Sequence, residues 1–222
     1  MVPHPPHKTH IFLVRHGETD GNAADMWQGC DDDGPLNKRG RQQSAAVAAY
    51  LAEQGPVTTI YTSPLRRARQ TARAIAQTTV APVVEVPALR EYDIGRLRSA
   101  NAQEIAHAWA SFVEKCHADP DLAPPGGEST RQFSQRLHNA LCEVLQQAAG
   151  QTAIVVSHQG ALATGLAALL GQLHRWQDYQ MANCAVTLLV RNGEDPPRIE
   201  HFNVIEHLTD IGTEVWSGHR HL

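Results

Sequence analysis

Short apolar runs and longer amphipathic segments alternate along this chain. The short runs predict strands at residues 10–14, 57–62, 83–86, 152–156, 184–190 and 198–203. Apolar residues at helical spacing predict helices at residues 36–54, from 63 to about 77, at 102–117, from 129 or 130 to 148, and at 160–171. Strands that alternate with helices are typical of an α/β domain.

The stretch 89–128 interrupts this alternation. It contains the expected helix at 102–117 and the loop sequence Pro124-Pro125-Gly126-Gly127. We therefore interpret it as an insertion placed over the functional site. The 222 residues fit one domain, 1–222, that carries this insertion.

The start of the predicted helix after residue 62 is unusual in its charge. Ser63 is suited to be its N-cap and Pro64 its first residue. Arg66, Arg67 and Arg69 would then lie in its first two turns, where positive charge opposes the helix dipole. Either an anion balances this charge or the arginines form an exposed basic face, and the pattern leaves both interpretations open.

Composition and charge exclude several classes of protein. Apolar residues make up 42% of the chain, which is enough for a sizeable core. The formal net charge is −4, so we expect no nucleic-acid partner. The longest apolar segment, residues 161–170, is too short to span a membrane, and the N-terminus lacks the apolar stretch of a signal peptide. We therefore expect a cytoplasmic enzyme without a membrane partner.

Metal-ligand spacing is absent from the sequence. The cysteines are far apart and form no CxxC pair: Cys30, Cys116, Cys142 and Cys184. The acidic run Asp31-Asp32-Asp33 precedes Gly34-Pro35, so we interpret it as a solvated turn rather than a metal cage. We interpret the histidines near the two ends as parts of polar termini rather than metal-binding arms: His4, His7, His10, His219 and His221.

The candidate chemistry lies where two predicted strands end. Arg15-His16 follows the first apolar run, and Ser157-His158 follows the run 153–156. The carboxyl ends of parallel strands line the ligand crevice of an open α/β sheet, so both histidines would reach the same rim. Two imidazoles and a guanidinium suit a phosphate group that an imidazole attacks. Taken alone, His158 would be interpreted as a hydrogen-bonded core histidine.

The motifs of this chain, taken in order, resemble those of the histidine phosphatases, the phosphoglycerate mutase-like superfamily. The resemblance covers most of the chain and rests on residues 13–19 (LVRHGET), Asn22, Gln28-Gly29, 35–40 (PLNKRG), 63–68 (SPLRRA), 89–91 (LRE), 125–129 (PGGES) and 156–158 (VSH). A lone Arg-His-Gly is a weak signal, whereas this order and spacing is specific. The resemblance implies a three-layer α/β/α sandwich with a mostly parallel, mixed sheet and a small helical cap at about residues 89–128.

The resemblance also implies a role for each matching residue. His16 would take up the phosphoryl group, while Arg15 and Arg67, the latter at the family's position, would grip its oxygens. His158 would complete the cationic pocket, and Glu91 would protonate the leaving alkoxide and then activate water. Further phosphate contacts would come from Asn22, Gln28, Gly29 and Gln159.

These observations predict a phosphatase that hydrolyses small-molecule phosphate monoesters through a phosphohistidine on His16, with no metal and no cofactor. One alternative is a cofactor-dependent phosphoglycerate mutase, although residues 95–120 lack the longer, more basic insertion of those enzymes. Another is a non-catalytic module that binds phosphate or a phosphoprotein. Departures from the family pattern at Met26, Arg98-Ser99 and Gln159 alter the substrate rim, so the sequence does not define the substrate. It also leaves the oligomeric state open, with a homodimer as one option.

Overall fold

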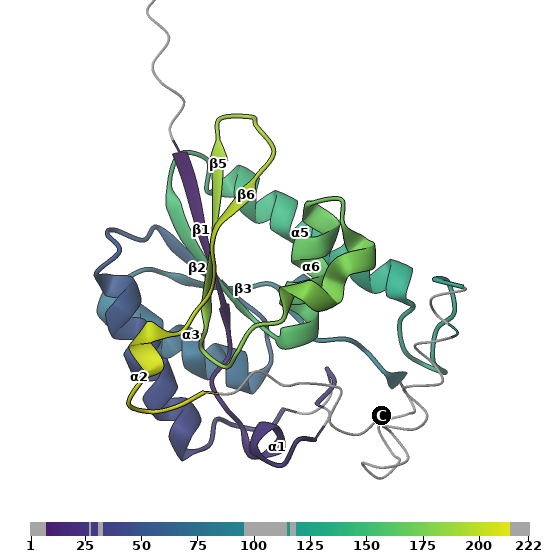
Figure 1. Ribbon diagram of the computed structural model, residues 1–222, viewed down its shortest axis with the longest axis horizontal. Helices are drawn as coiled ribbons and strands as arrows, with labels where there is room; N and C mark the ends of the chain where they lie inside the picture. The colour runs from purple at the N-terminus through teal and green to yellow at the C-terminus, as the bar shows by residue number, and fades with distance from the viewer. Residues whose placement is uncertain (1–7, 27, 31–32, 96–114, 116–118, 214–222) are drawn as a thin grey trace, which may run out of the picture.

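A mixed six-stranded sheet organises the residues that the computed structural model describes, which are 8–26, 28–30, 33–95, 115 and 119–213 (Figure 1). Its strands are β1 (Lys8–Arg15), β2 (Thr59–Thr62), β3 (Val83–Glu85), β4 (Thr152–Ser157), β5 (Val186–Asn192) and β6 (Arg198–Val204). Their order across the sheet is β3-β2-β4-β1-β5-β6. The first four of these pair in parallel, whereas β5 runs antiparallel to both of its neighbours.

Helices cover both faces of this sheet. On one face lie α2 (Lys38–Ala52) and α3 (Arg66–Thr79), and on the other lie α5 (Thr130–Gln147) and α6 (Gln159–Leu169) (Figure 1). Short helical turns occupy connections: α1 (Asp20–Ala23), η1 (Pro87–Leu89), η3 (Leu173–Tyr179) and η4 (Glu206–Leu208). The predicted α/β fold with a mixed sheet is therefore confirmed. Among the described residues, no helix is long and apolar enough to cross a membrane.

The side chains of β1 divide the core into two parts. Ile11 and Leu13 pack with α5 and α6, whereas Phe12 and Val14 pack with α2 and α3. All four side chains are buried. The central strand is covered on both faces, and this explains why its sequence is a continuous apolar run rather than an alternating one.

The predicted helix start at Ser63-Pro64 is wrong. Helix α3 begins at Arg66, and its N-cap, Leu65, makes no side-chain hydrogen bond. The Ser63 side chain is buried and is used elsewhere, and the Asp33 carboxylate from a distant loop accepts the Arg66 backbone N–H instead. Sequence signals near Arg66 do not reveal this cap, because the capping residue, Asp33, is far from Arg66 in the chain.

Part of the predicted cap lies outside the described residues. This applies to the helix expected at 102–117, apart from residue 115. Residues 20–23 and 173–179 form short helical turns that the apolar pattern did not predict. The other predicted strands and helices are present with shifted ends.

Helix α2 contacts the segment that follows β1 through a glycine. A Cβ on Gly40 would overlap the backbone carbonyl and amide of Glu18, so a larger residue would hold the helix away. The Asn37 side chain caps α2 by accepting the Gly40 amide at 2.8 Å. The Glu18 amide in turn donates to Gln43 Oε1 at 2.9 Å. These contacts fix the backbone two residues beyond His16.

We expect Gly40→Ala to lower the free energy of unfolding by about 2 kcal/mol or more, because the added methyl group overpacks this contact. Helix propensity alone would give the opposite sign, a gain of about 1 kcal/mol. Urea denaturation measures the difference. The control is Gln42→Ala, at an exposed position of the same helix, which should change this free energy by less than about 0.5 kcal/mol. Unchanged stability of Gly40→Ala would contradict the tight contact.

Candidate active site

The register between β1 and β4 brings the two histidines together. Arg15 pairs with Ser157 across the parallel ladder, so His16 and His158 each follow directly at the carboxyl end of a strand. The centroids of their rings lie 5.1 Å apart, and both residues are buried. The common rim predicted from two separate motifs is therefore present.

His16 presents one ring nitrogen, Nε2, without a proton. Its Nδ1 lies 2.7 Å from the Gly17 carbonyl oxygen, which can only accept, so Nδ1 carries the proton. Arg67 Nε donates to the other nitrogen, Nε2, at 3.2 Å. Burial holds the pKa of His16 well below its ordinary value, and the charges of Arg67 and Arg15 lower it further. The imidazole is therefore neutral near pH 7, with Nε2 available as a nucleophile.

Two buried guanidinium groups flank this imidazole. Arg67 is 1% exposed, and its Nη2 donates to the Gly29 carbonyl at 3.3 Å. Arg15 is also buried, and its Nη1 donates to the Met181 carbonyl at 2.9 Å. Burial lowers the pKa of Arg15 to about 10, with an opposing effect from Glu91. Two buried cations in one place favour an anion between them.

His158 is held by a serine that the sequence analysis assigned to a helix cap. Its Nε2 lies 2.7 Å from Ser63 Oγ, and that oxygen also accepts the Leu65 amide at 3.3 Å. Ser63 Oγ can donate to Nε2 or accept from it, according to the tautomer of His158. Burial keeps the pKa of His158 well below its ordinary value, and the charge of Arg67 adds to this effect. The signal that could have identified Ser63 is its position at the end of β2, on the same rim as both histidines.

Three buried nitrogen atoms on this rim have no hydrogen-bond partner within the described part of the chain: Arg15 Nε, His158 Nδ1 and Gln159 Nε2. Buried polar groups are almost always paired, so unpaired ones in one place point to a ligand. The Gln159 side chain is anchored at its other end, because its Oε1 accepts the Met181 amide at 2.9 Å. A phosphate group has enough acceptor oxygens to satisfy all three donors.

Glu91 is a buried carboxyl group at the N-terminus of α6. Its Oε1 accepts the Tyr92 amide and its Oε2 accepts the Gly160 amide, both at 2.9 Å. A Cβ at position 160 would lie 2.6 Å from Glu91 Oε1, so a larger residue here would displace the carboxyl group. Burial raises the pKa of Glu91, although the two amides and the charges of Arg67 and Arg15 oppose the shift. A carboxyl group that keeps its proton at higher pH is suited to general acid catalysis.

Two of the residues predicted to contact the phosphate, Asn22 and Gln28, also make hydrogen bonds that hold the loop after β1. Asn22 Oδ1 accepts the Thr19 amide in a capping box and the Asn183 side chain, both at 3.2 Å. Asn183 Nδ2 also donates to the His16 carbonyl at 2.9 Å, a link that the sequence analysis missed. Gln28 Oε1 accepts the Thr19 hydroxyl at 2.5 Å.

The three arginines near the start of α3 have three different environments. Arg67 is buried in the site, Arg66 is exposed, and Arg69 pairs with Glu85 at 3.7 Å. The interpretation as an exposed basic face therefore applies to Arg66, whereas the balance of charge by an anion stays a prediction for Arg67. Asp33, from the acidic run, binds the start of the helix.

Among the described residues, no three His, Cys, Asp or Glu side chains gather as a metal site would require.

Comparison with known proteins decides the family. Residues 11–205 match the family model described as histidine phosphatase superfamily (branch 1). The chain belongs to this superfamily. The expectation drawn from the order of the motifs is therefore confirmed.

The relatives include proteins named as mutases and proteins named as phosphatases. A probable phosphoglycerate mutase GpmB from Escherichia fergusonii is 34% identical over 180 residues, 80% of this chain and 82% of that protein. A metal-independent phosphoserine phosphatase from Arabidopsis thaliana is 38% identical over 160 residues, 69% of this chain and 66% of that protein. The structure of a phosphoserine phosphatase from Entamoeba histolytica, in complex with 3-phosphoglyceric acid, is 27% identical with a TM-score of 0.73, covering 90% of this chain and 99% of that one.

We expect the free energy of unfolding to fall as the pH decreases from 6.5 to about 5. The pKa values of His16 and His158 are lowered from 6.5, so the unfolded chain takes up protons in this range while the folded protein does not. Each histidine contributes up to about 1.4 kcal/mol per pH unit. Urea denaturation at a series of pH values measures the slope.

The control for this pH dependence is His158→Asn, which removes one of the two groups. Its slope should be shallower than that of the unmodified protein. The raised pKa of Glu91 acts in the opposite direction, because the folded state keeps a proton that the unfolded chain releases as the pH rises above 4.5. The contribution of Glu91 is present in both the unmodified protein and His158→Asn, so it cancels when the two slopes are compared. Equal slopes would contradict a neutral His158 in the folded state.

Proposed function

We propose that this protein is a phosphatase that hydrolyses small-molecule phosphate monoesters through a phosphohistidine on His16, without a metal ion. The observation that carries this proposal is the proton position on His16. The Gly17 carbonyl holds the proton on Nδ1, so Nε2 points its lone pair toward the Arg67 guanidinium. An anionic phosphate bound by that guanidinium would place phosphorus next to the nucleophile.

The proposed reaction has two steps. Nε2 of His16 attacks phosphorus and the bond to the ester oxygen breaks, while Glu91 transfers its proton to that oxygen. Glu91 then takes a proton from water as the water oxygen attacks phosphorus, and the phosphorus–nitrogen bond breaks to release inorganic phosphate. Arg15, Arg67 and His158 stabilise the charge on the transferring group in both steps.

Phosphoglycerate mutase activity is the second candidate, because several relatives are named as probable phosphoglycerate mutases. A mutase must keep its intermediate bound and exclude water, whereas a phosphatase lets water reach the phosphohistidine. Both share the first step on His16. The names of two relatives make phosphoserine and 3-phosphoglycerate the first compounds to test as substrates.

We expect hydrolysis of p-nitrophenyl phosphate in the presence of EDTA, because the positive charge in the site comes from side chains. Absorbance of the released nitrophenolate measures the rate. His16→Ala should lower kcat by at least about 1000-fold and abolish the acid-labile, alkali-stable label left by a phosphoryl donor. Inactivity of the unmodified protein over a pH series would favour a binding module. Conversion of 3-phosphoglycerate to 2-phosphoglycerate with little free phosphate would identify a mutase.

We expect Glu91→Gln to discriminate between leaving groups. An alkyl alcohol needs a proton in order to leave, whereas a nitrophenolate is stable as an anion. The variant should therefore lower kcat/KM, which reports the steps up to phosphoryl transfer to His16, by about 100-fold or more for an alkyl phosphate such as glycerol phosphate, and much less for p-nitrophenyl phosphate. Phosphate release measures both rates. Equal losses for the two esters would show that Glu91 is not the proton donor.

A further inference from the structure

The segment that carries Glu91 is irregular. After η1 it belongs to neither a strand nor a helix from Arg90 to Ile94. A buried backbone outside regular structure must find its hydrogen bonds elsewhere. Side chains provide several of them, because Ser157 Oγ donates to the Leu89 carbonyl at 2.6 Å and one arginine donates to the carbonyls of Ala88 and Arg90.

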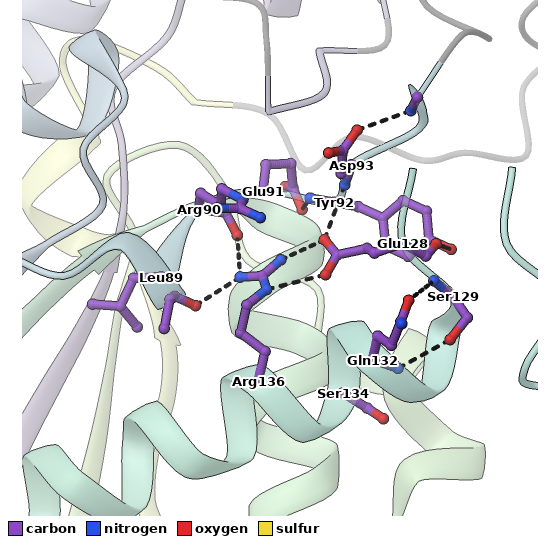
Figure 2. Close-up of polar contacts among 12 residues, drawn as sticks. Leu89, Arg90, Glu91, Tyr92, Asp93, Glu128, Ser129, Gln132, Ser134 and Arg136 are labelled. Atoms are coloured by element: carbon purple, nitrogen blue, oxygen red, sulfur yellow. Dashed lines mark hydrogen bonds and ion pairs between the residues drawn. The ribbon is translucent and has the colours of Figure 1, made fainter. Parts of the chain in front are cut away.

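That arginine is Arg136, from the first half of α5. Its Nη1 donates to the Ala88 carbonyl at 2.7 Å and to the Arg90 carbonyl at 3.1 Å (Figure 2). The rest of its guanidinium makes a two-point contact with Glu128, with Nη2 at 2.5 Å from Oε1 and Nε at 3.1 Å from Oε2. One side chain therefore binds the backbone just before Glu91 and a carboxylate at the same time.

Glu128 binds the backbone on the other side of Glu91. Its Oε1 accepts the Asp93 amide at 3.0 Å, and its own amide donates to the Asp93 carbonyl at 3.0 Å (Figure 2). The Tyr92 hydroxyl donates to the Glu128 carbonyl at 2.8 Å. The Arg136–Glu128 pair thus contacts residues 88, 90 and 93, which bracket the carboxyl group of Glu91.

Both members of the pair are themselves held in place. Glu128 directly precedes Ser129, which begins α5 through a capping box with Gln132. The Arg136 guanidinium lies over the ring of Phe133, 5.1 Å from its centroid. The side chains are 16% and 12% exposed, so solvent screens this ion pair only weakly.

We propose that Arg136 and Glu128 are positioning residues of the reaction, which set the direction of the Glu91 carboxyl group from the rigid start of α5. The inference rests on the proposed function, in which Glu91 donates the proton to the leaving group. Neither residue is among the groups proposed to bind the phosphate. They act by fixing the backbone on both sides of Glu91, so their loss lets the carboxyl group move relative to the ester oxygen. Proton transfer depends steeply on such geometry.

The test compares Arg136→Met with Glu91→Gln on an alkyl and an aryl phosphate. Arg136→Met should lower kcat/KM for glycerol phosphate by about tenfold or more, and kcat/KM for p-nitrophenyl phosphate by less than about threefold. A purely structural loss would lower both rates alike. Arg136→Lys, which keeps the charge and can reach one carbonyl, should recover part of the alkyl rate.

The matched control is Arg131→Met, which removes an arginine from the same helix. Arg131 pairs with Asp121 at 2.7 Å, and both side chains are exposed. This variant should leave both rates unchanged. Glu128→Gln keeps an acceptor for the Asp93 amide but loses the ion pair, and it should reproduce the alkyl-specific loss in milder form. If thermal denaturation shows that Arg136→Met does not fold, Glu128→Gln provides the same test.

A double variant shows whether Arg136 acts through Glu91. Adding Arg136→Met to Glu91→Gln should not change the ratio of alkyl to aryl rates further, because the group being positioned is already lost. An additional fall in that ratio, or an equal loss of both rates in Arg136→Met alone, would overturn the positioning role while leaving the proposed function intact. Equal losses in Glu91→Gln alone would instead remove the acid role, and the positioning role with it.

Discussion

The parallel pairing of β1 with β4 is the constraint on which the rest of the site depends. The ladder places Arg15 opposite Ser157, so the next residue on each strand is a histidine. A shift of one residue would move the apolar side chains of β1 to the wrong faces of the sheet. The two cores, which take alternate residues of β1, therefore fix the register, and the register fixes the distance between the two imidazoles.

Burial has opposite consequences for the acid and the base in this site. It favours the uncharged form of every titratable group, so it lowers the pKa values of His16 and His158 and raises that of Glu91. His16 is consequently neutral, while the carboxyl group of Glu91 tends to keep its proton. Arg15 and Arg67 remain charged because guanidinium is so strongly basic, and they supply the field that a phosphate would neutralise.

Sequence patterns predicted the parts of this molecule whose signals are local. Apolar runs predicted the strands, and His16 and His158 were identified because they closely follow two of these runs. The contact of Ser63 with His158 was missed, although Ser63 directly follows a predicted strand that ends on the same rim. The helix cap from Asp33 was not predictable, because Asp33 lies far from Arg66 in the chain. Asn183 was missed for the same reason, since its link to His16 exists only after the sheet has formed. The family resemblance identified Glu91, whose loop position gave no signal of its own.

The segment around Glu91 shows why a motif far from the acid belongs to the same site. Residues 125–129 matched the family pattern without any chemical role. In the fold, Glu128 binds the backbone beyond Glu91, and the next residue begins the helix that carries Arg136. One short stretch therefore starts a helix and anchors an irregular segment. The ladder places the backbone of both histidines, and neighbouring groups then orient their rings. The backbone around Glu91 lies outside the ladder, so side chains from Glu128 and Arg136 bind it instead.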